Sequence, residues 1–213
     1  MQAAINSKID FSHIILLSGQ DYPIKSNQYI HDFLARNKER EFIAFYPIPN
    51  NFWTNQGLDR IQSFHFLEFK NAYLIKGLRR ISSVFSKIYR RKFPKELHPY
   101  GGPAWWCLTQ KCVKFLLGYA QTNRSIIRFF KFVKFPDEIF FQTVVCNSIF
   151  APNVQNSSLT YVNWTNSSDL IVLGIDNFDS LKASDKLFAR KFDPKFDPNI
   201  FDKLDHENQA IRD

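Results

Sequence analysis

The sequence is poor in cysteine, and this scarcity argues against a fold stapled by disulfides. Its three cysteines, Cys107, Cys112 and Cys146, are an odd number, and each lies among apolar residues. Their spacing matches no zinc-binding pattern. We therefore expect them to be buried free thiols in a protein of a reducing compartment.

Histidine is sparse and scattered, which argues against several kinds of catalytic site. The sequence shows no Ser-His-Asp order, and it has no glycine loop that would cradle a phosphate. We expect no metal and no bound cofactor. His13 lies in an apolar run and is predicted to be a core residue with its hydrogen bond satisfied. The five histidines are His13, His31, His65, His98 and His206.

Long apolar runs are absent too, and none approaches the roughly 20 residues that a membrane-spanning helix needs. The start of the chain, Met1 to Lys8, does not resemble a signal peptide. Acidic residues are outnumbered, so the chain carries a net charge of +8, which favours an anionic partner. The candidates are a nucleotide diphosphate, nucleic acid and an acidic membrane surface.

Aromatic residues, in contrast, are abundant in a chain of otherwise ordinary globular composition. The 213 residues are enough for one full domain or two small ones. They include 23 Phe, 8 Tyr and 4 Trp. Aromatic side chains fill cores, but Trp and Tyr rings also form platforms for sugars and bases.

Strand and helix patterns alternate along the chain. Residues 11–17 form a short apolar run closed by Ser18-Gly19, which is typical of a buried strand whose following loop binds a ligand. Ser26 can cap the next helix. The residues from 196 to 213 are expected to form a loosely packed polar tail. Further predictions are strands at 41–46, 161–164 and 170–175, a strand or hairpin at 61–69, and helices at 27–37, 110–121 and about 177–188.

Residues 72–92 show apolar residues at helical spacing among many cations. The pattern favours a solvated surface helix. The alternative is a basic amphipathic helix that contacts an anionic membrane through residues 76–92. The cations are Lys76, Arg79, Arg80, Lys87, Arg90, Arg91 and Lys92.

The segment from Phe135 to Val145 places two carboxylates between a proline and an apolar run. Proline and acidic residues are both favoured in the first turn of a helix. Helix-start rules alone favour surface acids that face water. The alternative is that Glu138 acts as a general base, which needs a carboxylate held rigidly within hydrogen-bond reach of a proton.

Paired glycines precede paired tryptophans in the segment from Tyr100 to Thr109. Gly101 and Gly102 suggest that the backbone passes close to a ligand or to another strand. Of Trp105 and Trp106, we expect one to lie in the core and the other to line a pocket.

Five blocks of the sequence, in order, resemble those of one family. The first spans Leu16 to Ser26, with Ser18-Gly19-Gln20-Asp21 at its centre. The others are Tyr100 to Thr109, Pro136-Asp137-Glu138 with Phe141-Gln142-Thr143, Tyr161 to Trp164, and Leu187 to Asp193. Together they resemble the core-2/I-branching N-acetylglucosaminyltransferases, a family that includes the peptide O-xylosyltransferases.

The resemblance implies a fold and a reaction. The fold is an α/β domain of the GT-A type, with a mixed central sheet flanked by helices. The reaction is the inverting transfer of a sugar, expected to be N-acetylglucosamine, from a UDP-sugar to a hydroxyl of a glycan. The family lacks the usual Asp-x-Asp metal motif, so a metal-independent reaction is expected. The scarce cysteines and the missing signal predict a bacterial-type cytoplasmic enzyme, peripheral at the inner face of the membrane.

The resemblance also implies roles for single residues. Glu138 is the expected catalytic base, and it should face Lys191 across a cleft that admits the nucleotide sugar. The donor diphosphate should meet Lys191 and Arg190, because positive charge can replace a metal beside the leaving UDP. The loop with Ser18, Gly19 and Asp21 lies where the donor is expected. Residues expected at the acceptor are Trp164, Asp137, Trp105 and Gly102.

The sequence departs from the family pattern at two places. The family has a second basic residue before its last strand, whereas residues 165–169 contain no Arg or Lys. The family also carries strands and helices ahead of the first block, where this sequence has about ten residues. We therefore expect a glycosyltransferase domain over residues 1–195 that lacks its N-terminal part.

Two other functions remain open. The first alternative to an active enzyme is a catalytically inactive remnant that binds a glycan or a partner. The second is a nucleic-acid-binding protein. A basic nucleic-acid-binding protein is supported only by the net charge and the aromatic residues, and no RNA-binding motif is present. We expect no nucleic acid partner.

Overall fold

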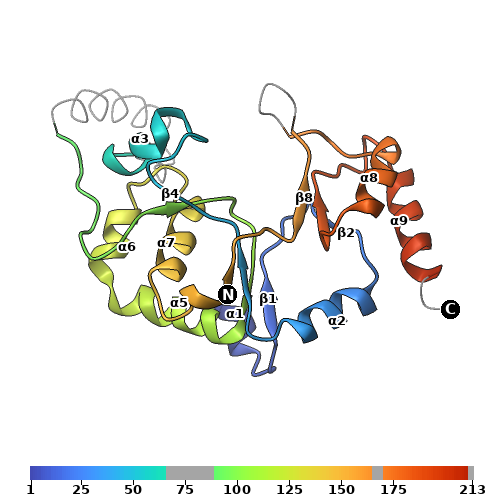
Figure 1. Ribbon diagram of the computed structural model, residues 1–213, viewed down its shortest axis with the longest axis horizontal. Helices are drawn as coiled ribbons and strands as arrows, with labels where there is room; N and C mark the ends of the chain where they lie inside the picture. Colours follow the sequence, from blue (N-terminus) through green and yellow to red (C-terminus); the bar gives the residue numbers. More distant parts are fainter. Residues whose placement is uncertain (66–88, 165–169, 211–213) are drawn as a thin grey trace. The chain divides into compact units, whose positions relative to one another are not determined.

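The computed structural model describes residues 1–65, 89–164 and 170–210, and the chain forms two compact units. Unit 1 comprises Met1–Ile9, Ala44–Ala104 and Lys111–Val154. Unit 2 comprises Asp10–Ile43, Trp105–Gln110 and Gln155–Asp213. Each unit is therefore built from segments that are distant in the sequence (Figure 1).

Unit 1 is mostly helical. One cluster of buried side chains in this unit draws on four separate segments: Ile48, Ile61, Ile126, Phe130, Val133 and Ile139. Its elements are α1 (Gln2–Asn6), β4 (Tyr46–Pro47), η1 (Thr54–Gly57), α3 (Leu58–Gln62), β5 (Tyr100–Gly101), α5 (Gln110–Thr122, whose first residue belongs to unit 2), α6 (Arg124–Phe130), η2 (Pro136–Glu138), α7 (Phe140–Cys146) and η3 (Ala151–Asn153).

Unit 2 combines strands with covering helices. Its elements are β1 (His13–Ile15), β2 (Tyr22–Pro23), α2 (Asn27–Arg36), β3 (Glu41–Ile43), β6 (Trp106–Thr109), β8 (Thr160–Val162), η4 (Ile175–Asn177), α8 (Phe178–Ala183), β9 (Phe188–Arg190) and α9 (Asn199–Ala210). The short strand β7 (Val154–Gln155) lies at the boundary between the two units.

The strands form three small sheets. One has the order β1-β6-β3-β7, with β6 antiparallel to both β1 and β3. A second has the order β2-β9-β8, with β9 antiparallel to β2 and parallel to β8. The third pairs β4 with β5. The predicted mixed α/β architecture is confirmed, although the strands are divided among three sheets.

Two buried polar side chains in the β1-β6-β3 region, Glu41 and His13, have hydrogen-bond partners close by. The Glu41 carboxylate is 1% exposed and accepts hydrogen bonds from the Thr109 amide and hydroxyl at 2.8 and 2.6 Å. His13 is buried as predicted, and its Nε2 lies 3.1 Å from the Arg40 carbonyl oxygen. Cys107 and Cys112 are buried free thiols, which confirms that part of the cysteine prediction.

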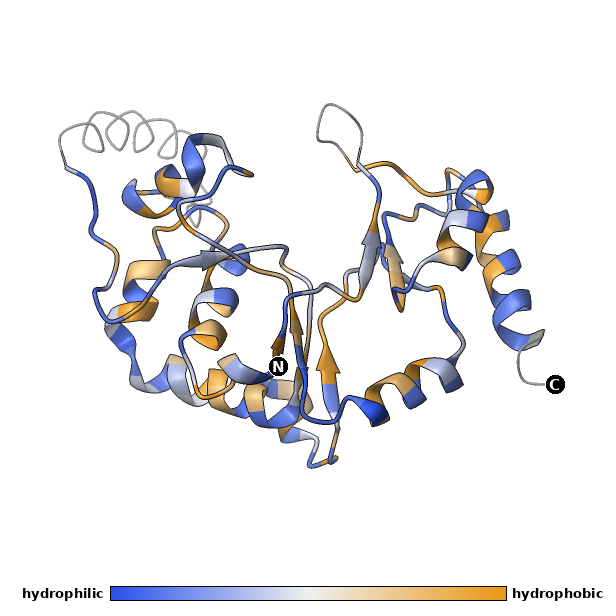
Figure 2. Ribbon diagram, viewed as in Figure 1, coloured by the Kyte–Doolittle hydropathy of each residue, from blue (hydrophilic) through white to orange (hydrophobic). Residues whose placement is uncertain are grey.

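Helix predictions with a local signal were confirmed. The Ser26 hydroxyl accepts a hydrogen bond from the Tyr29 amide at the start of α2. The helix expected at 110–121 is α5. Hydrophilic and hydrophobic residues alternate along α2 and α5, in agreement with one covered and one exposed face (Figure 2).

Two strand predictions were wrong for the residues that the structure describes. Of the strand or hairpin expected at 61–69, residues 61 and 62 end the helix α3, because Ile61 packs into the unit 1 core from a helical turn, and residues 66–69 lie outside the described residues. In the expected strand at 170–175, Leu170 makes only an isolated bridge to Trp164. Ile171 and Leu173 instead donate single hydrogen bonds to the carbonyls of Asn163 and Lys191. The helix expected at about 177–188 is the shorter α8.

The prediction of a loosely packed tail was also wrong. Most of that segment forms α9, whose Ile200 and Leu204 are 0% and 2% exposed. These residues are four positions apart and so share one face of the helix. They pack with Leu173 and Leu181, and Tyr22 donates a hydrogen bond to Asp205 at 2.9 Å.

The predicted membrane contact at 76–92 lies largely outside the described residues, because 66–88 are not among them. Residues 89–92 are described and are not helical. Arg91 is buried and donates to the carbonyls of Ser63, Phe129 and Phe132, and burial lowers its pKa to about 10. Arg91 therefore does not belong to an exposed cationic face. Within the described part of the chain, no helix is long and apolar enough to cross a membrane.

Candidate active site

Glu138 ends a single 3₁₀ turn, not the first turn of a continuous helix. Phe135 precedes the turn in the left-handed region at φ 52°, and Pro136 opens it. Ile139 is fully buried and its φ and ψ are not helical, so α7 starts anew at Phe140. The predicted helix start is thus a short, separately held turn that carries Glu138 at its end.

Gly102 fixes the backbone of this turn from the neighbouring segment. Its amide donates to the Glu138 carbonyl at 2.9 Å. A Cβ at Gly102 would lie 2.1 Å from the Ala44 carbonyl oxygen, so only glycine fits there. Gln142 donates to the Pro103 carbonyl at 2.7 Å and ties α7 to the same segment. The expected close approach at Gly102 is therefore to protein backbone, and its contact with an acceptor stays a prediction.

The Glu138 carboxylate is held by an arginine that the sequence did not indicate. Arg60 of α3 donates from Nη1 to Glu138 Oε2 at 2.5 Å. Its guanidinium lies over the Trp53 ring, 3.6 Å from the centroid, and 5.1 Å from the centroid of Phe135. The side chain of Glu138 remains 33% exposed, whereas that of Arg60 is 17% exposed. The carboxylate is thus oriented and still accessible.

Aromatic side chains complete this site. The rings of Tyr46 and Trp53 meet edge to face, with centroids 5.2 Å apart. Burial raises the pKa of Tyr46, and the negative charge of Glu138 raises it further. Added Cβ atoms at Gly57 and Gly101 would lie 2.6 and 2.3 Å from the Trp53 ring, so both glycines make room for the indole. Sequence reasoning missed these partners, and the glycines were the available signal.

The loop after β1 is closed by its own polar groups. The Asp21 carboxylate accepts a hydrogen bond from the Ser18 amide, and the Asp21 amide donates to the Ser18 carbonyl at 3.2 Å. Gly19 is exposed, with open space where a Cβ would project. The Asp21 side chain is 0% exposed. It therefore presents no surface of its own to a ligand.

Asp21 instead pairs with a donor-site candidate. Its Oδ1 lies 3.4 Å from Arg190 Nε. The Arg190 guanidinium stacks over Trp105, 4.0 Å from the ring centroid. Burial lowers the pKa of Arg190, while Asp21 raises it. Trp106 is 3% exposed, so the prediction that one of the two tryptophans lies in the core is confirmed.

Lys191 and Trp164 are more accessible. Lys191 is partly exposed, and its ammonium group has no hydrogen bond or ion pair within residues 1–65, 89–164 and 170–210. Its backbone carbonyl accepts from the Leu173 amide at 2.8 Å. The Trp164 side chain is 56% exposed, and Asp137 is exposed as well. All of them can meet a ligand.

The predicted site residues fall into two sets. Glu138 and Lys191 belong to different units, so the cleft expected between them stays a prediction. Among the residues that the structure describes, no group of three or more His, Cys, Asp or Glu side chains could hold a metal ion. Glu138, Asp137 and Gly102 lie in unit 1, whereas Ser18, Gly19, Asp21, Trp105, Trp164, Arg190 and Lys191 lie in unit 2.

Comparison with known proteins finds similar sequences among enzymes named as glycosyltransferases. The chain is 28% identical to Xylosyltransferase 2 of Homo sapiens and 30% identical to Xylosyltransferase 1 of Mus musculus, each over 70% of its length. It is 27% identical to Beta-glucuronosyltransferase GlcAT14B of Arabidopsis thaliana over 93% of its length. The chain covers 16%, 14% and 44% of these three proteins.

A family model gives the more specific result. The model of the Core-2/I-Branching enzymes matches residues 1–182. The chain therefore belongs to the Core-2/I-Branching enzyme family, and the predicted resemblance is confirmed. Its mixed α/β fold, with helices flanking mixed sheets, is consistent with a GT-A-like glycosyltransferase domain.

Proposed function

We propose that this chain carries the catalytic part of an inverting glycosyltransferase that moves a sugar from UDP to a glycan hydroxyl. The observation that carries this proposal is the carboxylate of Glu138, which is braced by Arg60 yet one-third exposed, in a member of a glycosyltransferase family. A general base must be rigidly placed and accessible at the same time.

In this proposal Glu138 accepts the proton of the acceptor hydroxyl. The hydroxyl oxygen forms a bond to the anomeric carbon while the bond from that carbon to UDP breaks on the opposite face. The proton passes to the carboxylate, and the electron pair of the broken bond leaves with UDP. Arg60 acts as a positioning residue, because it contacts Glu138 and not the reacting atoms.

The leaving UDP needs positive charge near its diphosphate. Lys191 supplies an ammonium group without a partner among the described residues, and Arg190 supplies a guanidinium oriented by Asp21. Ser18 and Gly19 lie on the same loop as Asp21, where the donor is expected. We propose that these cations replace a metal ion, so that the reaction is metal-independent and needs no cofactor.

The acceptor is proposed to meet exposed aromatic and acidic groups. The 56% exposed ring of Trp164 offers a flat apolar face on which a sugar can stack. Asp137 can accept hydrogen bonds from sugar hydroxyls, and Trp105 is proposed to form part of the wall. We propose N-acetylglucosamine as the donor sugar and a surface glycan as the acceptor, made at the cytoplasmic face of the membrane.

A UDP-release assay with a glycan acceptor tests the proposal. UDP-N-acetylglucosamine, UDP-xylose and UDP-glucuronic acid are compared, because the relatives are named for xylosyl and glucuronosyl transfer. Each donor is assayed with and without a chelator. We expect release to persist with chelator and to be lost in Glu138→Gln. Release that strictly requires a divalent metal would overturn the proposed roles of Lys191 and Arg190.

The ion pair between Glu138 and Arg60 also favours a second function. A carboxylate that is already paired can be a structural group in a binding module that has lost catalysis. In that case the chain binds a UDP-sugar or a glycan without turnover, and Glu138→Gln leaves the binding unchanged. Calorimetry with UDP and with the glycan, run beside the release assay, separates the two functions.

A further inference from the structure

Helix α6 has two faces of opposite character. Ile126 and Phe130 are 2% and 4% exposed and pack in the unit 1 core with Ile139, the residue after Glu138. On the other side, Arg124, Arg128 and the following Lys131 are exposed. These three residues are spaced by four and three positions and therefore share one face. The exposed side of α6 is a cationic stripe.

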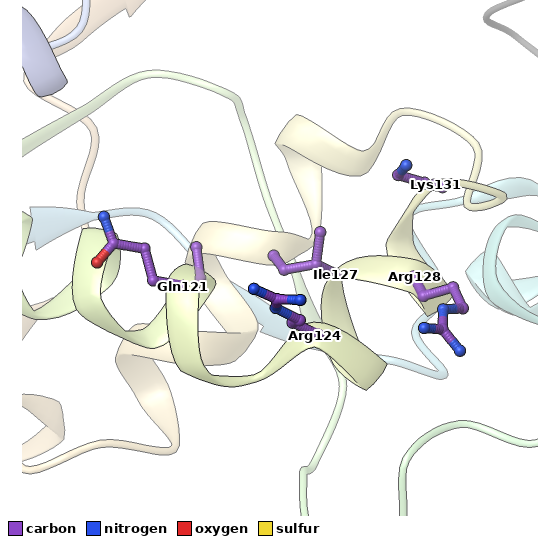
Figure 3. A pocket seen from close by; sticks show the side chains of 6 residues that line it. Gln121, Arg124, Ile127, Arg128 and Lys131 are labelled. Carbon is purple, nitrogen blue, oxygen red and sulfur yellow. The ribbon is translucent and has the colours of Figure 1, made fainter.

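The stripe borders a hollow between the end of α5 and α6. The hollow has a volume of about 410 Å³. Its lining includes the apolar residues Ala120 and Ile127 and the polar residue Gln121 (Figure 3). The other lining residues are the three cations of the stripe, and no acidic residue lines the hollow. A small molecule that enters it can meet both positive charge and apolar carbon.

The cations of the hollow lack the partners that other arginines of the chain have. Arg60 pairs with Glu138, Arg190 pairs with Asp21, and Arg91 donates to backbone carbonyls. Within the described part of the chain, no side-chain hydrogen bond or ion pair is formed by Arg124, Arg128 or Lys131. Three neighbouring positive charges without an acid repel one another, and a bound anion would remove that repulsion.

We propose that this hollow binds a phosphate ester group. A phosphate carries more charge than a carboxylate, and the planar fork of arginine matches its oxygens with two parallel hydrogen bonds. The methyl groups of Ala120 and Ile127 would contact the carbon side of the ester. The site lies in unit 1 and is separate from Lys191 in unit 2. It neither requires nor supports the proposed transfer reaction.

The test uses the full chain with two phosphate sources. Glycerol phosphate serves as the soluble probe, and phosphatidylcholine vesicles with and without phosphatidylglycerol serve as the lipid probe. The variant combines Arg124→Gln, Arg128→Gln and Lys131→Gln. The control combines Arg36→Gln, Lys38→Gln and Arg40→Gln, which removes the same charge from three residues of unit 2. Circular dichroism checks the fold of both.

We expect the arginine Nε–H resonances of Arg124 and Arg128 to shift with at least one phosphate source. The variant should bind glycerol phosphate at least about tenfold more weakly than the control. For vesicles, each lost cation should weaken binding about fivefold. Binding of only one source supports the site and identifies where its phosphate comes from.

Other outcomes overturn the proposal. Equal losses in the variant and the control would show an effect of net charge alone. No binding of either phosphate source by the unmutated chain would remove the site. Binding of a carboxylate polymer such as polygalacturonate, without binding of any phosphate source, would contradict the proposal as well. If the variant fails to fold, the resonance shifts in the unmutated chain still decide the question.

Discussion

Two arginine–carboxylate pairs in this chain are built from the same parts and differ in exposure. Arg60 stacks on Trp53 and pairs with Glu138 in unit 1, and Arg190 stacks on Trp105 and pairs with Asp21 in unit 2. The Glu138 side chain is 33% exposed, whereas the Asp21 side chain is 0% exposed.

This difference in exposure indicates different roles: Glu138 can react with a substrate, whereas Asp21 stabilises the fold. A buried carboxylate stabilises its arginine, and removing it leaves an uncompensated charge in the interior. The Glu138 carboxylate also pairs with a largely buried arginine, but it is one-third exposed and can exchange a proton with a substrate. We therefore expect substitutions at Glu138 to affect activity and substitutions at Asp21 to affect folding.

The largest expected effect is the loss of transfer in Glu138→Gln. The amide keeps the size of the side chain and cannot accept the proton, so the rate should fall by about 10²–10⁴-fold. The UDP-release assay measures the rate. Urea unfolding should show a loss of stability of at most about 1 kcal/mol, because water screens the partly exposed ion pair with Arg60. Full activity in this variant would remove Glu138 from the mechanism.

The next effect is on folding, in Asp21→Ala. The substitution removes the acceptor of the Ser18 amide and the charge partner of the Arg190 guanidinium. We expect a loss of about 3 kcal/mol in the free energy of unfolding, as for other buried pairs that lose one partner. Asp137→Ala, at an exposed neighbour of Glu138, is the control and should change stability by less than about 0.5 kcal/mol. Equal stability of both variants would contradict the comparison.

A smaller effect on activity is expected for Arg60→Lys. Lysine keeps the charge but loses the planar group that stacks on Trp53, so Glu138 should be placed less accurately. We expect kcat to fall about tenfold, with KM nearly unchanged, since poor placement of a catalytic group costs rate. Arg36→Lys, on the surface of α2, is the matched control. A change in KM alone would make Arg60 a substrate-binding residue instead.

Local signals in the sequence predicted only some features of the fold. Ser26 correctly marked the start of α2, whereas the Pro-Asp-Glu block indicated a helix start at Glu138 and the structure has a separate 3₁₀ turn there. The partner of Glu138 was beyond this reasoning, because Arg60 is 78 positions away in the chain and the contact depends on tertiary packing. Gly57 and Gly101 could be noted in the sequence, but their contact with the Trp53 ring could not be predicted from it.

Burial was the property that sequence reasoning misjudged most. Asp21 was expected at the donor site because its loop follows the first strand and resembles the family's first block. Its side chain is instead fully buried beside Arg190. The tail was predicted to be loose because of its polar composition, yet two apolar residues four positions apart, Ile200 and Leu204, suffice to bury one face of α9.

The smallest expected effect is a change in the titration of Tyr46. Burial and the nearby charge of Glu138 both hold the pKa of Tyr46 above its ordinary value of 10.0. The variant Glu138→Gln removes the negative charge and keeps the burial, so the pKa of Tyr46 should fall part of the way back. Asp21→Ala should leave it unchanged, because Asp21 is not among its interactions. The ultraviolet absorbance of tyrosinate, taken as the difference from Tyr46→Phe, measures this value.

An equal pKa of Tyr46 in the unmutated chain and in Glu138→Gln would mean that the charge of Glu138 does not affect Tyr46. In that case, the electrostatic part of the contrast between Glu138 and Asp21 would be wrong.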